Sequence, residues 1–99
     1  MSSGNVFRDL ALPNAAELKI KSGLAIEITR AVHRLGLTQQ EAAERMGITQ
    51  PKLSGLMRGN FSNLSEAKLM LCLSRLGYDI EIKVRPAKSG AGRRTLAVA

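Results

Sequence analysis

A chain of 99 residues is long enough for one small domain with a modest hydrophobic core. Hydrophobic residues make up 44% of it and aromatic residues only 3%, which favours a helical core of Leu, Ile, Ala and Met over an all-β one. The net charge of +7 points to a polyanion or an acidic protein as partner, and the single cysteine, Cys72, excludes an intramolecular disulfide and a zinc site.

The positive charge is unevenly distributed along the chain. Four basic residues, Arg85, Lys88, Arg93 and Arg94, lie in a C-terminal stretch without acids, which leaves +3 for residues 1–84. Net charge therefore supports nucleic-acid binding only weakly. The N-terminus lacks an apolar signal core and no run of residues is long enough to cross a bilayer, so we expect a cytoplasmic protein without a membrane partner.

Residues 1–13 are expected to form a loosely ordered N-terminal arm, or to contribute a short strand or turn over residues 5–8 at a dimer interface. A helix is predicted over residues 15–35, because Asn14 and Glu17 have capping-box spacing and apolar residues recur at helical intervals. An irregularity is expected near Ser22 and Gly23. The buried stripe of this helix is predicted to be Leu24, Ala25, Ile28, Ala31, Val32 and Leu35.

Residues 38–59, TQQEAAERMGITQPKLSGLMRG, have the pattern of two short helices joined by a tight turn. Thr38 and Glu41 can form a capping box at the start of the first helix, and Gly47 can supply the positive φ at its end. Thr49 or Gln50 begins the second helix, with Pro51 in the first turn, where a missing N–H costs nothing. The stretch predicts a helix-turn-helix.

The two faces of this unit differ in chemistry. The inner face is predicted to be Ala42, Ala43, Met46, Ile48, Leu53 and Leu56. The outer face of the second helix is predicted to be Gln50, Lys52, Ser54, Gly55 and Arg58. This outer set contains no carboxylate that would repel phosphate, which suits a surface that contacts DNA.

A further helix is predicted after Ser65, with Leu69, Cys72, Leu73 and Leu76 buried and Gly77 at its end. Residues 78–85 then alternate apolar and polar, which predicts a strand with Tyr78, Ile80, Ile82 and Val84 on one face. A single strand cannot satisfy its own backbone groups, so we expect it to pair with a second copy across a two-fold axis. The alternative is pairing with the N-terminal arm. Residues 86–99 are expected to form a flexible basic tail, or to order when Arg93 and Arg94 contact phosphate or a partner protein.

The helix-turn-helix resembles that of the Xre/Cro family of bacterial and phage repressors. The residues that carry the resemblance are Leu37, Thr38, Gln39, Ala43, Gly47, Ile48, Thr49 and Gln50, with Arg58 and Gly59 at the close. The sequence from Gln50 onward is similar to the HigA-like antitoxin branch, and the resemblance covers roughly residues 5–85. It implies an all-α, lambda-repressor-like domain (residues 14–85) of about four to five helices, with the C-terminal β-strand (residues 78–85) paired across a dimer.

The resemblance also implies residue roles in binding double-stranded DNA. Gln39 would hold a phosphate, and Gln50 would address a base edge, for which glutamine can make a bidentate pair with adenine. Thr49, Pro51, Ser54 and Gly55 occupy the other contact positions along the second helix. Lys52, Arg58 and Asn60 are the further phosphate candidates.

The main functional hypothesis from these observations is a dimeric repressor that binds a palindromic operator. Resemblance to the HigA-like branch adds the role of an antitoxin that binds a RelE-fold toxin. The alternative is a protein-interaction module that has this fold and binds a partner protein without DNA. An enzyme is not expected, because His33 is the only histidine, the carboxylates are scattered and no glycine-rich phosphate loop follows a strand; no cofactor or metal is expected either.

Overall fold

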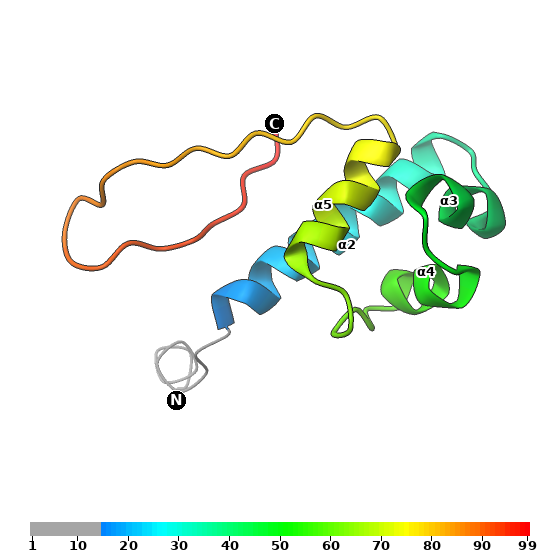
Figure 1. The fold of residues 1–99 in the computed structure, drawn as a ribbon, viewed down its shortest axis with the longest axis horizontal. Coiled ribbons are helices and arrows are strands. Elements are labelled where there is room, and N and C mark those ends of the chain that lie inside the picture. Colours follow the sequence, from blue (N-terminus) through cyan, green and yellow to red (C-terminus); the bar gives the residue numbers. More distant parts are fainter. Residues whose placement is uncertain (1–14) are drawn as a thin grey trace.

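The computed structural model describes residues 15–99, and four helices are found within that range (Figure 1). They are α2 (Ala15–Arg34), α3 (Gln39–Met46), α4 (Gln50–Met57) and α5 (Glu66–Arg75). The expectation of a helical domain is confirmed for this part of the chain. The predicted N-terminal arm and the cap at Asn14 lie outside the described residues.

The long helix α2 is the base on which the other helices pack. In Figure 1, α5 lies along α2, while α3 and α4 lie together at one end of this pair. α4 contacts α2, and α3 contacts both α4 and α5. The core between the helices contains Leu24, Ile28, Val32, Ala43, Met46, Leu53, Leu56, Leu69, Cys72 and Leu73, all at most 3% exposed. The predicted inner faces of the helices are confirmed.

Two details of the predicted first helix are wrong. α2 is continuous through Ser22 and Gly23, where an irregularity was expected, because one glycine within a helix of 20 residues lowers its stability without breaking it. The helix also ends at Arg34, one residue earlier than predicted, and Leu35, which directly follows it, is 37% exposed instead of buried.

Hydroxyl side chains start three of the helices. Thr38, Thr49 and Ser65 each accept a hydrogen bond from the backbone N–H three residues later. At α3 the capping box is complete: the Glu41 N–H donates to Thr38 Oγ1 at 3.1 Å, and the Thr38 N–H donates to Glu41 Oε1 at 2.9 Å. Hydrogen bonds from Thr38, first its backbone N–H and then its side chain, lower the pKa of Glu41 below its usual 4.5. The stabilisation from this carboxylate is therefore present above that pH and lost as the pH falls.

Replacing Thr38 with Ala should lower the free energy of unfolding by about 1 kcal/mol, because it leaves the Glu41 N–H without its side-chain acceptor. Urea denaturation followed by circular dichroism would measure the loss. Thr38→Ser is the matched control, since it keeps the oxygen and should stay within about 0.5 kcal/mol of the parent. Equal stability of the Ala and Ser variants would contradict a contribution from the cap.

All four helices end with the same pair of backbone features. A glycine with positive φ follows the helix, and the next residue donates its N–H back into the last turn. These donors are Leu37, Ile48, Asn60 and Tyr78, at 2.8–3.1 Å from their acceptors. Leu37, Ile48 and Tyr78 also pack against the core, whereas Asn60, after α4, is exposed. The end of the second helix of the helix-turn-helix thus presents a polar side chain where the other ends bury an apolar one.

The turn after α3 is tied to α5 by polar contacts. Gly47 has φ of 74°, as expected from the sequence, and the Arg75 guanidinium donates to the Met46 carbonyl at 3.4 Å. A cation at this position interacts favourably with the C-terminal end of a helix. Cys72 lies fully buried beneath the same turn, and burial raises the pKa of its thiol. The prediction that Cys72 is buried is confirmed.

Residues 78–85 are extended but do not pair as a strand, and no strand is found within residues 15–99. Tyr78 is held at the C-terminal end of α2, where its hydroxyl accepts a hydrogen bond from the Arg34 guanidinium at 3.0 Å. Ile80, Ile82 and Val84 are 39%, 73% and 92% exposed, so the expected burial of one face does not occur within a single chain. The physical reason is that no described segment pairs with their backbone as a strand or covers the three apolar side chains.

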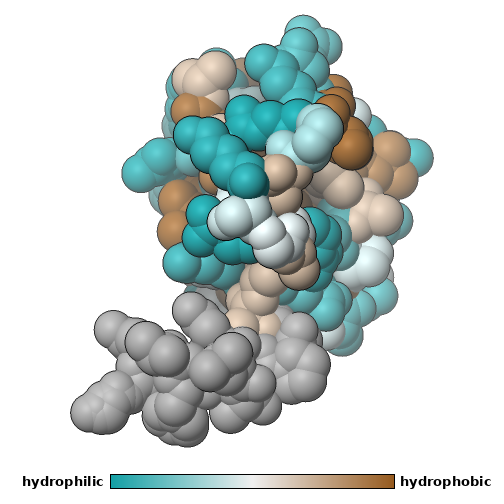
Figure 2. All heavy atoms as spheres, turned by 90° about the vertical axis from the view of Figure 1, so that its left-hand side faces the viewer, coloured by the Kyte–Doolittle hydropathy of each residue, from teal (hydrophilic) through white to brown (hydrophobic). Residues whose placement is uncertain are grey.

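The remaining tail leaves the end of α5, reverses direction and returns toward α2 (Figure 1). Arg94 forms an ion pair with Glu66 at 2.6 Å, at the start of α5. Figure 2 views the molecule from the side of the tail and shows a mainly hydrophilic face on which hydrophobic residues form separate small patches. None of the helices in residues 15–99 has the combined length and apolar character that a membrane crossing needs.

Candidate nucleic-acid interface

The candidate interface is the outward face of α4, together with the first turn of α3 and the residues that follow α4. Leu53 and Leu56 anchor α4 in the core and fix which side of it faces outward. Thr49, Gln50, Pro51, Lys52, Arg58 and Asn60 are exposed there, and Ser54 and Gln39 are partly exposed. Eight of the nine predicted DNA-binding residues are therefore at least partly accessible to solvent.

Gln39 and Gln50 are joined directly. The Gln50 side-chain Nε2 donates to Gln39 Oε1 at 3.1 Å, which links the first residue of α3 to the first residue of α4. This contact occupies one of the two N–H donors of Gln50 and leaves its Oε1 available as an acceptor. A glutamine held in this way has one donor and one acceptor to offer, which is the combination that the major-groove edge of adenine requires.

A second pair of polar side chains lies one turn further along α4. Arg58 Nη1 donates to Ser54 Oγ at 2.5 Å, so the guanidinium is held along the helix. Arg58 and Lys52 are the two cations on α4 and its C-cap, and α4 contains no acid. Positive charge therefore lies near both ends of α4, as expected for a surface that approaches phosphates.

Gly55 corrects the sequence prediction, which placed it on the outer face. It is buried, and its carbonyl accepts from the Asn60 N–H at 2.8 Å. A Cβ at position 55 would lie 3.4 Å from the Asn60 carbonyl oxygen, so the turn after α4 packs directly on this residue. Asn60 occupies the accessible position above it, and Gly55 permits that close packing instead of offering its own surface to DNA.

A metal site or a second basic surface elsewhere in residues 15–99 would be another candidate binding site. No group of three or more His, Cys, Asp or Glu residues there could hold a metal ion. The basic tail residue Arg94 is committed to Glu66, and the tail lies on the opposite side of the molecule from α4 (Figure 1). The charge of Arg94 therefore does not reinforce the α4 face.

Comparisons with known proteins agree with this geometry. The profile of a helix-turn-helix domain family matches residues 6–85, which is most of the chain. The chain belongs to this helix-turn-helix domain family. A solved structure described as an XRE family transcriptional regulator is 36% identical to it, with a TM-score of 0.79, and the match covers 88% of this chain and 100% of the other. A comparison with curated proteins gave no significant match.

Two features of this helix-turn-helix domain were not predicted from the sequence. The hydrogen bond between Gln39 and Gln50 joins residues 11 positions apart on separate helices. The only signal for it was that both residues open a helix, and openings of consecutive helices meet where the connecting turn is tight. The packing of Asn60 over Gly55 had no signal beyond the glycine itself, which a helix interior otherwise disfavours.

Proposed function

We propose that this helix-turn-helix domain protein is a sequence-specific DNA-binding transcriptional regulator that acts as a repressor in the cytoplasm. The observation that carries the proposal is the acid-free outer face of α4, on which Gln50 is oriented by Gln39. Family membership and the likeness to an XRE family transcriptional regulator support it.

In the proposed complex α4 lies in the major groove and α3 crosses the backbone. Gln50 offers its Oε1 to adenine N6 and its second N–H to adenine N7, while Gln39 offers its own amide N–H groups to the adjacent phosphate. Thr49, Pro51 and Ser54 line the groove beside Gln50. Lys52, Arg58 and Asn60 contact phosphates on either side, and these contacts make the affinity depend on salt.

A single domain offers few base contacts, so the proposal includes a homodimer on a palindromic operator. Residues 78–85 are extended and alternate apolar and polar residues, and all of them after Tyr78 are exposed. Pairing two such segments across a two-fold axis would satisfy their backbone groups and cover Tyr78, Ile80, Ile82 and Val84. The two copies of α4 would then address half-sites about one helical turn, roughly 34 Å, apart.

Ile82→Pro should dissociate this dimer, because proline removes a backbone donor from the paired segment. Analytical ultracentrifugation should show the parent as a dimer and the variant as a monomer at the same concentration. The helical content should stay unchanged, since Ile82 is 73% exposed and is not among the residues that pack against the core. Ala87→Pro, just beyond the segment, is the matched control, and a dimer in both variants would rule out this interface.

The resemblance to the HigA-like branch adds a finer proposal, namely that the protein is the antitoxin of a type II toxin–antitoxin pair and binds a RelE-fold toxin. The observation that would test it is a reading frame of toxin size beside the gene, followed by co-purification of the two products. A protein-interaction module without DNA binding is the competing reading of the same fold.

Selection of bound sequences from random double-stranded DNA tests the regulator and the dimer together. The expected result is an enriched sequence with dyad symmetry, an adenine in each half-site and a centre-to-centre spacing of about one helical turn. Enrichment of a single half-site would retain the regulator and reject the dimer. The absence of any enriched sequence at about 50 mM salt would reject sequence-specific DNA binding.

A further inference from the structure

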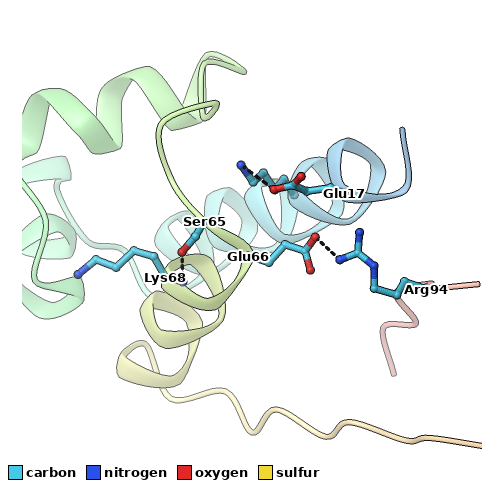
Figure 3. Close-up of polar contacts among 6 residues, drawn as sticks. Glu17, Ser65, Glu66, Lys68 and Arg94 are labelled. Carbon is cyan, nitrogen blue, oxygen red and sulfur yellow. Dashed lines mark hydrogen bonds and ion pairs between the residues drawn. The ribbon is translucent and has the colours of Figure 1, made fainter. Parts of the chain in front are cut away.

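A hollow on the outer side of α2 is bounded on its other side by the chain's own tail. Its walls on α2 are Lys19, Ile20, Gly23, Ile26, Glu27 and Arg30. Arg94, Thr95, Leu96 and Val98 form its opposite wall as an extended segment. Figure 3 shows Arg94 pointing from the tail toward Glu66, beside the part of α2 that carries Glu17.

The absence of a side chain at Gly23 allows the tail to pack closely against α2. A Cβ at position 23 would lie 2.6 Å from Leu96 Cδ2, so the leucine side chain occupies the space above the bare glycine backbone. A glycine within a helix costs about 1 kcal/mol relative to alanine. The contact with Leu96 gives this position a structural use.

The tail also provides a chemical description of what the hollow accepts. The Arg94 guanidinium pairs with Glu66, Leu96 two positions later lies over Gly23, and Val98 two positions after that lines the hollow. In an extended segment, residues two apart point to the same side. One side of the segment from Arg94 to Val98 therefore makes all three contacts.

We propose that this hollow is a docking site for an extended segment of a partner protein with a basic residue followed at the second and fourth positions by aliphatic residues, and that the tail shields the site until the partner displaces it. The site is independent of the α4 face and of DNA binding.

Two observations favour displacement over a permanent seal. The tail is held lightly: Leu96 and Val98 are still 39% and 56% exposed, and residues 79–92, which lead to the docked segment, are exposed throughout. The hollow also continues beyond the tail. A second apolar hollow shares Ile26 and Arg30 with the first and extends between α2 and the end of α4 to Met57 and Phe61. A partner segment that fills both hollows buries more apolar surface than the tail does.

The test uses the full chain and a fluorescein-labelled peptide of residues 93–99, RRTLAVA, with binding measured by fluorescence anisotropy. In the parent, the tethered tail competes at an effective concentration in the millimolar range. Leu96→Asp should release the tail, so the peptide should bind this variant at least about ten-fold more tightly than the parent. Adding Gly23→Ala to the Leu96→Asp chain should weaken peptide binding at least about ten-fold, because the new methyl group fills the leucine site.

Gly23→Ala is informative because alanine favours the helix, so lost binding cannot arise from misfolding. A peptide with glutamate in place of Arg94 should bind the released chain weakly and should recover on a chain that also carries Glu66→Arg. The proposal is overturned if the Leu96→Asp chain binds no better than the parent, or if Gly23→Ala has no effect. It is also overturned if the parent self-associates in sedimentation and Gly23→Ala abolishes the association, since the occupant is then the tail of a second copy.

Discussion

Gln50→Ala should weaken binding to the selected operator about ten- to a hundred-fold, the loss expected when one bidentate contact to a base is removed. The effect should be confined to sequences with adenine at the contacted position, because Gln50 has both a free acceptor and a donor to offer there. Affinity for unrelated DNA should change little. Fluorescence anisotropy at one fixed salt concentration, with operator and random duplexes side by side, would measure both quantities.

The controls for Gln50 are available on the same surface. Gln40→Ala removes an exposed glutamine from the first turn of α3 and should leave discrimination between the two duplexes intact. Lys52→Ala should weaken both duplexes by a similar factor and reduce the salt dependence, as expected for a phosphate contact. If Gln50→Ala instead lowers both affinities equally, Gln50 contacts the backbone and the proposed adenine contact is wrong.

Leu53→Ala should destabilise the domain by about 2–5 kcal/mol, because it opens a cavity where the inner side of α4 meets the rest of the core. Leu53 is fully buried, and a small domain has only about 5–15 kcal/mol of stability in total. The melting temperature should fall by roughly 10 °C or more. Thermal unfolding followed by circular dichroism would measure it, and DNA binding should fall in parallel as the folded fraction decreases.

Leu71→Ala is the matched control for Leu53. It removes the same atoms from a helix, but Leu71 lies on the outer side of α5 and is 42% exposed. Its cost should be about 1 kcal/mol or less, since exposed side chains leave no cavity. Equal losses in the two variants would mean that α4 is not held by the core contact that orients its outer face.

Much of this fold could be predicted from the sequence because many of its features depend only on residues that are close together in the chain. The Thr38–Glu41 capping box and the positive φ at Gly47 each depend on residues within one turn of each other. The inner residues of α3 and α4 follow from helical spacing. These features are read correctly without knowledge of the rest of the chain.

The features that could not be predicted depend on contacts between distant parts of the chain. Gly55 was placed on the outer face because its helical position is compatible with either side, and only the return of Asn60 buries it. The docking of Leu96 over Gly23 joins residues separated by most of the domain. For residues 78–85 the alternation of apolar and polar residues predicts that one side is buried. It does not say which segment, of this chain or of another, covers that side.

The way the helices end has a consequence for how this protein can change over evolutionary time. The turns that bound α4 are closed by the Thr49 hydroxyl and by backbone hydrogen bonds after Arg58, and its position is set by Leu53 and Leu56. None of these contacts uses the exposed side chains at positions 50, 51 and 52. If α4 reads DNA as proposed, substitutions there would retarget the domain to another operator at little cost in stability, and single mutations would then give new specificities on an unchanged scaffold.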